Sequence, residues 1–468
     1  MRAGPWALCA TVALAACTTP ERAARDARDS VRRDLDLRLG TLPRDEPGVV
    51  SDLRVRALLA DGVDEDEAVR IALLSNRAIV ARYAELGVAA ADLAQASLWA
   101  NPILDVGFLF FDDGTEIDLG LSQSFVDVLM RSRRTATAEH EIDAARARVS
   151  RDVVAHAFAT RRAHVNALAA RDRFELETKH ASATEASVGL MRRLHDAGNV
   201  TASSVALEES ALAARLLDRS AAEIAALAAR EALGREMGLW AESADWSLAG
   251  DLRAGPAAGV DLENVESRAI AASLDLAERR ATMNVLAQAG GLARWDMLLS
   301  DASLGIGVSK DADGSEWGVG PHGSIGIPLG DVGSARQYGA DARLAAAAAD
   351  HWQHALHIRS TARTFRDRLR ALDADARFSR EVHVPAEQRV VRETLRNFNA
   401  MQIGPFDVLR AQGMELMAER RGVSLLADAW KARLDLEELL AGSANDARLT
   451  SDGYMSAPTT APGARGDH

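Results

Sequence analysis

The longest feature of this sequence is a stretch of helical periodicity from Val126 to Ala197. Apolar residues, many of them alanine, recur there at the i, i+3, i+4 spacing that places them on one helix face, and no proline interrupts them. A helix of that length extends about 108 Å at 1.5 Å per residue. Helices of compact globular domains rarely exceed about 25 residues, so the stretch predicts a rod. The low aromatic content, 4%, agrees with long helices packed through Ala and Leu.

The same order of segments occurs twice along the chain. Each half reads as a short helix, a strand pair, a very long helix, a turn and a shorter helix. The helices are expected at 64–100, 126–197 and 201–240 in the first half, and at 262–293, 334–401 and 405–441 in the second. In each half the two shorter helices together match the long one in length, as in a rod of constant cross-section.

A weak internal match supports this duplication. The segment SNRAIVA (75–81) resembles ESRAIAA (266–272). We therefore expect a first repeat at 64–241, a linker at 242–261 and a second repeat at 262–441. The tail, 442–468, is small, polar and rich in Pro and Gly, a composition typical of disorder.

Two β-hairpins, at 103–125 and 297–329, separate the helices of each repeat. Apolar side chains alternate along all four strands with small, polar or acidic ones, and turn sequences containing Asp-Gly lie between the strands. In water the apolar face needs a cover, and the hairpins supply none. In a membrane barrel the same pattern is expected, with apolar residues toward lipid and polar residues toward the lumen. Because about eight strands are needed to close such a barrel, the chain is predicted to oligomerise.

The alternation assigns the charged strand residues to the lumen. The residues expected there are Asp105, Glu116, Asp118 and Asp301, with His322 as the single residue on those faces that can become basic. Pro321 conflicts with this assignment, because proline lacks the N–H that a closed barrel strand must donate. A bulge, or a position outside the lipid layer, would accommodate it.

The N-terminus has the features of a bacterial lipoprotein signal. An apolar run from Trp6 to Ala16 is too short to span a bilayer as a mature helix and ends in Leu-Ala-Ala-Cys at Cys17, which resembles the lipoprotein cleavage box. The resemblance implies removal of residues 1–16, lipidation of Cys17 and a lipidated segment at 17–63. Thr18 in place of Asp implies sorting to the outer membrane. The alternative is an ordinary signal peptide followed by a chance cysteine.

Taken in order, these motifs resemble the TolC-like outer-membrane efflux family over about residues 50–442. The motifs are Cys17, AVRIALLSNRAIVA (68–81), Asn101-Pro102, SIGIPLGDVGSARQYGADARLAAAAAD (324–350) and the two helical turns near 198 and 402. The resemblance implies a fold that is mostly α with a small β part, in a homotrimer that forms a 12-stranded barrel on a helical tunnel. It also implies a channel in the outer membrane of a Gram-negative bacterium, extending into the periplasm and contacting a periplasmic adaptor and an inner-membrane pump.

The two helical turns are the predicted periplasmic mouth of the tunnel. Three-fold symmetry would arrange their polar residues in rings that gate the tunnel or contact the adaptor: Asp196, Gly198, Asn199, Gln402 and Asp407. Simple capping of two helix ends explains the same residues. The chain departs from the family pattern where Asn-Pro is often found, at Asn76-Arg77 and Ser267-Arg268, and at Gln402, where Gly is expected.

Other classes of function find little support in the sequence. The net charge of −13 disfavours nucleic acid as a partner. No nucleophile–base pair or phosphate loop is recognisable, so we predict neither an enzyme nor a cofactor. No metal site is assigned. His351, His354 and His357 have spacing that would let adjacent pairs share a metal, but a solvated or interface face of a rod explains them better.

The expected function is an exit duct for drugs, toxic small molecules or metal ions. Two alternatives stay open: the duct of a type I protein secretion system, and a non-porous coiled-coil lipoprotein that tethers the layers of the cell envelope.

Overall fold

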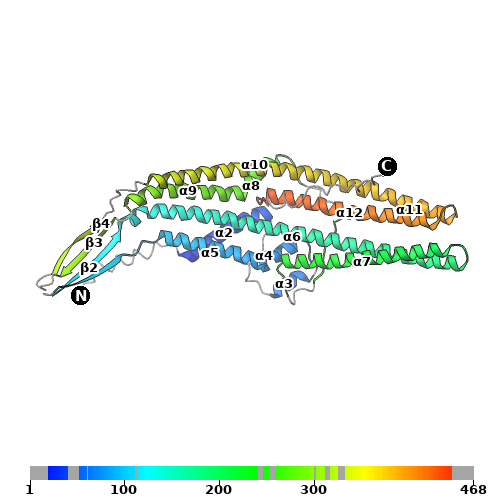
Figure 1. Ribbon diagram of the computed structural model, residues 1–468, viewed down its shortest axis with the longest axis horizontal. Helices are drawn as coiled ribbons and strands as arrows, with labels where there is room; N and C mark the ends of the chain where they lie inside the picture. The colour runs from blue at the N-terminus through cyan, green and yellow to red at the C-terminus, as the bar shows by residue number, and fades with distance from the viewer. Residues whose placement is uncertain are drawn as a thin grey trace, which may run out of the picture.

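The computed structural model describes residues 19–40, 52–60, 62–111, 114–240, 246–252, 260–299, 302–310, 317–324 and 333–444. These residues form an elongated body in which the longer helices run along the long axis, with a small sheet at one end (Figure 1). In chain order the elements are α2 (Pro20–Leu39), α3 (Asp52–Leu59), α4 (Glu65–Ser75), α5 (Arg77–Ser97), β1 (Ile103–Phe111), β2 (Gly114–Ser124), α6 (Phe125–Asp196), α7 (Ala202–Glu236), α8 (Val265–Ala272), α9 (Leu274–Leu299), β3 (Ser303–Lys310), β4 (Trp317–Ser324), α10 (Ser334–Phe378), the π-helical turn η3 (Ser379–His383), α11 (Val384–Asn399) and α12 (Pro405–Leu440).

Helix α6 is the rod that the periodicity predicts. It has 72 residues and begins where the Asp127 N–H donates to the side chain of Ser124. It packs against α5 and α9 toward the sheet and against α7 and α12 toward the other end. Its middle turns carry Val149, Val153 and Phe158, which are buried in the main apolar cluster together with side chains from α2, α5 and α12. The first repeat and the second repeat therefore share one core.

The shorter helices that precede the strands are each broken in two, contrary to the single helices expected at 64–100 and 262–293. The first break is at Asn76, whose backbone is extended. The Ala78 N–H donates to Asn76 Oδ1 (2.8 Å), and Asn76 Nδ2 donates to the Glu236 carbonyl (2.9 Å). The side chain thus caps α5 and also ties the break to the end of α7.

The equivalent break in the second repeat is at Ser273, where the Leu276 N–H donates to Ser273 Oγ (3.2 Å). Ser267, which the sequence match aligns with Asn76, lies inside α8 instead. Helix α9 also continues to Leu299, so Leu298, expected in a strand, is helical. Four of the six residues before it, Leu, Ala, Arg and Met in the segment LARWDM (292–297), are good helix formers, which favours continuation of α9 over the short alternation.

Helix α2 was not expected within the N-terminal segment 17–63. Its buried residues recur at every fourth position, at Ala23, Ala27, Val31 and Leu35, and it lies along α5 and α6. At its end, Arg38 Nη1 donates to the carbonyl of Ala272 (2.7 Å) and to that of Ala441 (2.8 Å). The end of α2 is therefore hydrogen-bonded to the ends of α8 and α12 through Arg38.

The long helix expected at 334–401 contains a π-helical turn, η3, between α10 and α11. Pro385 explains it, because proline has no N–H to donate to the carbonyl four residues earlier and its ring collides with that carbonyl. The Val384 N–H instead donates five residues back, to the carbonyl of Ser379. The second long helix is thus interrupted at one defined place, whereas α6 is assigned as a single α-helix over its whole length.

Candidate functional site

The sheet joins the two predicted hairpins into one layer. Its strands lie in the order β1-β2-β3-β4, all antiparallel, so that β1 and β4 are its edges. The second hairpin is shorter than the expected 297–329: β3 and β4 cover 303–310 and 317–324, and residues 325–329 lie outside the described part of the chain. The two hairpins, far apart in sequence, are paired through β2 and β3.

The strand register places apolar side chains on one face of this sheet, which we call the apolar face. Pairs such as Val106↔Leu119, Leu119↔Val308 and Val308↔Val319 connect all four strands. The apolar face contains Leu104, Val106, Phe108, Phe110, Ile117, Leu119, Leu121, Leu304, Ile306, Val308, Trp317 and Val319. Large parts of it are open, with Phe110 81% and Val319 71% exposed.

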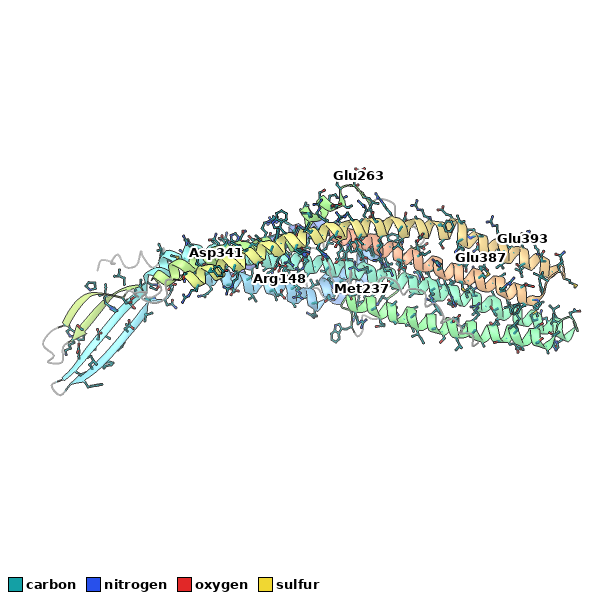
Figure 2. The ribbon with its side chains drawn as sticks, turned by 45° about the horizontal axis from the view of Figure 1, so that its top comes forward. Arg148, Met237, Glu263, Asp341, Glu387 and Glu393 are labelled. Carbon is teal, nitrogen blue, oxygen red and sulfur yellow. The ribbon has the colours of Figure 1, made fainter. Side chains whose placement is uncertain are left out.

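No helix of the described chain covers the sheet. The sheet projects beyond the ends of the helices in both views (Figures 1 and 2). A contiguous apolar surface of this kind is unfavourable in water and marks a protein or membrane contact. The sheet is therefore incomplete without lipid or another chain against it.

The opposite face, which we call the polar face, carries mostly small, polar and acidic residues. The register pairs Asp105 with Gly120 and Gly107 with Asp118. It also places Gly305 beside both Ser122 and His322. Glycines therefore leave room next to the two aspartates and the histidine.

Glu116 lies on the polar face too, opposite Leu109. Ile103, at the start of β1, and Leu109 are large apolar residues on this mostly polar side. Four of the five residues expected in the lumen thus share a face. The fifth, Asp301, lies outside the described residues.

Aromatic and basic side chains lie at both ends of the apolar band. Toward the helices, the Arg131 guanidinium is 5.3 Å from the ring centroid of Trp99; at the far end, Lys310 Nζ is 5.7 Å from that of Trp317. Three of the four strands have eight or nine residues and extend about 26–30 Å, close to the apolar height of membrane barrels; β2, with 11 residues, is longer. Trp and Lys prefer the interface between lipid and water, so the band has the dimensions and rims of a bilayer-facing surface.

Pro321 lies in β4, in register with Ile306. Because β4 is an edge of this sheet, a proline there is tolerated when its nitrogen points away from β3. The conflict noted in the sequence concerns a closed barrel, in which a second chain would pair with β4.

The two helical turns lie together at the end opposite the sheet (Figure 1). In the α6–α7 turn the Asn199 N–H donates to the Leu194 carbonyl (2.8 Å) and Gly198 has a left-handed φ of +80°. In the α11–α12 turn the Gln402 N–H donates to the Asn397 carbonyl (2.9 Å) and Met401 has φ +57°. Met401 therefore occupies the left-handed position that glycine favours. The sequence analysis expected this position at Gln402, one residue later, and that prediction is wrong.

The polar residues expected at these turns are largely exposed. Asp196, Asn199 and Gln402 are open to solvent, and Asp407, half-buried in the first turn of α12, has an oxygen 3.7 Å from Arg410 Nη2. The Ser204 N–H donates to the Thr201 hydroxyl, which caps α7. The side-chain cap of α7 thus comes from Thr201, and Gly404, which precedes α12, supplies none.

A layer of charged residues between the middle of α6 and the turns was missed in the sequence. Arg420 of α12 contacts Glu177 of α6 (Nη2–Oε2, 2.6 Å) and Asp218 of α7 (Nη2–Oδ2, 2.7 Å). Its neighbour Glu419 contacts His180 of α6, and the hydrogen bond from His180 holds the pKa of Glu419 below its ordinary value. No local pattern indicates this layer, because its partners are more than 200 residues apart in the chain.

The three histidines of α10 do not form a recognisable metal centre. The rings of His354 and His357 have centroids 6.2 Å apart. The pKa of His351 is lowered, first by burial and then by Arg280 and Arg279, which disfavour a further cation. Within the described ranges there is no cluster of three or more His, Cys, Asp or Glu side chains suited to a metal ion.

Among the helices described here, none is both long and apolar enough to cross a bilayer.

The elongated helical body with a four-stranded sheet at its end is the fold of the TolC-like outer-membrane efflux channels, which confirms the resemblance seen in the sequence at the level of the fold. A membrane protein from Pseudomonas aeruginosa superposes with a TM-score of 0.68 at 14% identity, over 86% of this chain and 98% of its own. The outer membrane protein VceC from Vibrio cholerae gives 0.68 at 16% identity, over 81% and 96%.

The open state of the MtrE outer membrane channel from Neisseria gonorrhoeae gives 0.65 at 14% identity, over 86% and 95%. No family model matches the sequence. No curated protein matches it either. The fold is thus shared with these channels at a sequence identity too low to carry residue roles across.

Proposed function

We propose that this protein is the outer-membrane exit duct of a tripartite efflux system. The observation that carries the proposal is the exposed apolar face of the sheet, backed by a polar face and bounded by Trp99 and Trp317. Lipid against the apolar face and water against the polar face would give each face of the sheet a favourable environment. The solved structures of this fold named above include channels of outer membranes.

The duct is a homotrimer. The sheet has free edges at β1 and β4, and three copies joined edge to edge would give a closed barrel of 12 strands. The helical body also exposes apolar residues: Leu217, Ile224 and Leu227 on α7, and Trp352, Leu356 and Phe378 on α10. Neighbouring copies around a three-fold axis would cover such surfaces.

The tunnel leads from the barrel to the two helical turns. At this end a periplasmic adaptor would connect the duct to an energised inner-membrane pump, and Asp196, Asn199, Gln402 and Asp407 would form polar rings at the mouth. The cargo is a drug, a toxic small molecule or a metal ion, passed without energy input by the duct itself. A duct of type I protein secretion is the second candidate.

The chain is anchored in the outer membrane by acylation of Cys17, which lies outside the described residues. Helix α2 begins at Pro20 and follows α5 and α6, so the anchor site is connected to the body by a short segment. Labelled palmitate should enter the wild-type protein and not Cys17→Ser. Equal labelling of both would contradict this anchor.

The proposal is tested by electrophoresis of the purified protein and by its mass in detergent. A closed barrel resists SDS without heating and should migrate differently after boiling, and the mass should be that of three chains. A non-porous coiled-coil tether would show a single migration at both temperatures. A monomer with no change on heating would contradict the duct.

A further inference from the structure

A cleft of about 410 Å³ lies between α6, α12 and the π-helical turn η3. Its walls come from α6, the end of α10, η3, the start of α11 and α12, with Leu252 from the segment before α8. Helix α12 packs against all the other helical elements of these walls (Figure 1). Binding sites for small molecules have volumes of about 300–1,000 Å³. The cleft is therefore large enough for such a molecule, and a single chain builds it.

Much of the wall is apolar. The aliphatic side chains that line the cleft are Leu176, Leu252, Ala376, Val384, Val423 and Leu426. Leu252 belongs to the main apolar cluster, and Leu426 packs against that cluster. The Trp430 indole N–H donates to the Leu252 carbonyl (3.1 Å), which ties this residue to α12. An apolar ligand would thus leave water for a surface that continues into the core of the protein.

Ser379 contributes a buried hydroxyl to the same wall. The residue is 2% exposed, and its Oγ has no hydrogen-bond partner among the described residues. Its backbone carbonyl accepts from the Val384 N–H, so only the side chain is left over. A hydroxyl within a helix often donates to the carbonyl four residues earlier, as Ser424 Oγ does to Arg420 (3.1 Å). Because a buried hydroxyl without a partner is costly, Ser379 has a hydrogen bond to offer to a ligand.

A glycine on the facing helix keeps space beside this hydroxyl. A Cβ at Gly422 would lie 3.2 Å from Ser379 Oγ and 3.7 Å from Val384 Cγ2, so a larger residue would press against both. The π-helical turn that carries Ser379 follows from Pro385, and single π-helical turns within α-helices are frequent at functional sites. The geometry around Ser379 is thus that of a site and not of a continuous helix pair.

The charges on the wall favour an uncharged ligand. The charged residues of the wall are Asp172, Glu175, Lys179, Arg380 and Glu419. Each carboxylate already contacts a basic residue outside the wall: Arg171 contacts Asp172 and Glu175, and His180 contacts Glu419. A cationic ligand would have to compete with these contacts, and an anionic ligand would meet more carboxylates than cations.

We propose that this cleft binds an uncharged amphipathic small molecule, with an apolar ring system against the aliphatic wall and one hydroxyl or carbonyl group hydrogen-bonded to Ser379. Phenols and naphthols have this chemistry and fit the volume. The site belongs to one chain, so it depends on neither the closed barrel nor the passage of cargo through a duct.

The test compares two probes that differ by one hydroxyl, 2-naphthol and naphthalene. Equilibrium dialysis against the purified full-length protein in lipid nanodiscs, with empty nanodiscs subtracted, measures the affinity of each probe. The wild type should bind 2-naphthol about tenfold more tightly than naphthalene, because only 2-naphthol gives the Ser379 hydroxyl a partner. Ser379→Ala should remove this difference and leave the affinity for naphthalene unchanged. Val423→Phe should fill the cleft and abolish binding of both probes.

The matched control is Thr361→Val on α10. Thr361 also has a buried hydroxyl without a partner among the described residues, but it lies about 27 Å from Ser379 along the helix and is not part of the cleft wall. This variant should keep both wild-type affinities. Equal affinities for the two probes in wild type, an unchanged difference in Ser379→Ala, or no saturable binding above empty nanodiscs would each overturn the site. Selective binding of 2-naphthol by a protein without ion conductance would retain the site and reject the duct, whereas conductance without binding would do the reverse.

Discussion

Gly198 and Met401 occupy the same position in the two helical turns, each with a left-handed backbone and the same pattern of closing hydrogen bonds. Glycine adopts this conformation freely, whereas a residue with a Cβ loses about 1 kcal/mol there. Met401, whose side chain is 91% exposed, gains no packing in return. The second turn is therefore the weaker of the two.

Met401→Gly should stabilise the α11–α12 turn by about 1 kcal/mol, because it removes the backbone strain. Gly198→Ala should destabilise the α6–α7 turn by a similar amount. Amide hydrogen exchange at residues 398–402 and 195–199 measures both, and a change of about 1 kcal/mol alters protection about fivefold. Faster exchange in Met401→Gly would show that the methionine side chain stabilises the turn through a contact.

Asp105→Asn/Asp118→Asn should reduce the cation preference of the channel without loss of folding. Both residues lie on the polar face, opposite Gly120 and Gly107. Three copies would line the pore with solvated carboxylates, whose fields are screened within about 8 Å at physiological salt, so the preference should be modest and larger in dilute salt. Reversal potential across a salt gradient is the measurement. Anion preference in the wild type would show that the two faces of the sheet are assigned the wrong way round.

Arg420→Met should destabilise the protein by about 3 kcal/mol, because it leaves the Glu177 side chain, 1% exposed, without its cation. Addition of Glu177→Leu should restore much of the loss, since two apolar side chains need no partner. The control is Arg192→Met, whose pair with Glu209 is exposed and worth under about 1 kcal/mol. Denaturant titration in detergent measures all three. Equal losses for Arg420→Met and Arg192→Met would contradict the importance of the buried pair.

Glu208→Gln should stabilise the protein at neutral pH and leave its stability nearly unchanged below about pH 4.5. Burial raises the pKa of Glu208 on α7, partly offset by the Ser187 hydrogen bond, and Glu208 Oε2 is buried without a partner among the described residues. A carboxyl whose pKa is raised in the folded state costs no stability at pH values below its unfolded-state pKa. The cost grows as the pH rises from the unfolded-state pKa through the folded-state pKa.

The gain for Glu208→Gln should be about 1 kcal/mol at neutral pH. Unfolding by denaturant at mildly acidic and at neutral pH measures it, with the neighbouring, exposed Glu209→Gln as a control that should show little pH dependence. A larger gain in acid than at neutral pH would reverse the sign and reject the argument.

Features set by local sequence were predicted well. Helix α6 begins and ends within one residue of the expected bounds, because Ser124 caps its start and Gly198 ends it. The alternation along the strands predicted the two faces that the register later showed, since the strand period of two is unambiguous when one face is apolar. The order of helix, strand pair, long helix, turn and shorter helix is also observed in both halves, although the helix before each strand pair is split and η3 interrupts the second long helix.

Features set by distant contacts were not predicted. The break at Ser273 is held where the Leu274 N–H donates to the Gly442 carbonyl (2.9 Å), far along the chain. Helix α2 depends on packing against α5 and α6, and its Ala-rich face gives only a weak signal. The charged layer joins α6 to α12, so neither helix alone indicates a partner. The role of Asp196, Asn199, Gln402 and Asp407 at a tunnel mouth stays a prediction.

The proposed duct is tested most directly by conductance across a planar lipid bilayer. The purified full-length protein should insert and give discrete steps of ion current. The steps should be small when the turns are held together and larger in Arg420→Met, which removes the contacts of α12 with Glu177 of α6 and Asp218 of α7. A well-folded protein that inserts, yet gives no steps in either form, would contradict the central conclusion that this chain forms a channel.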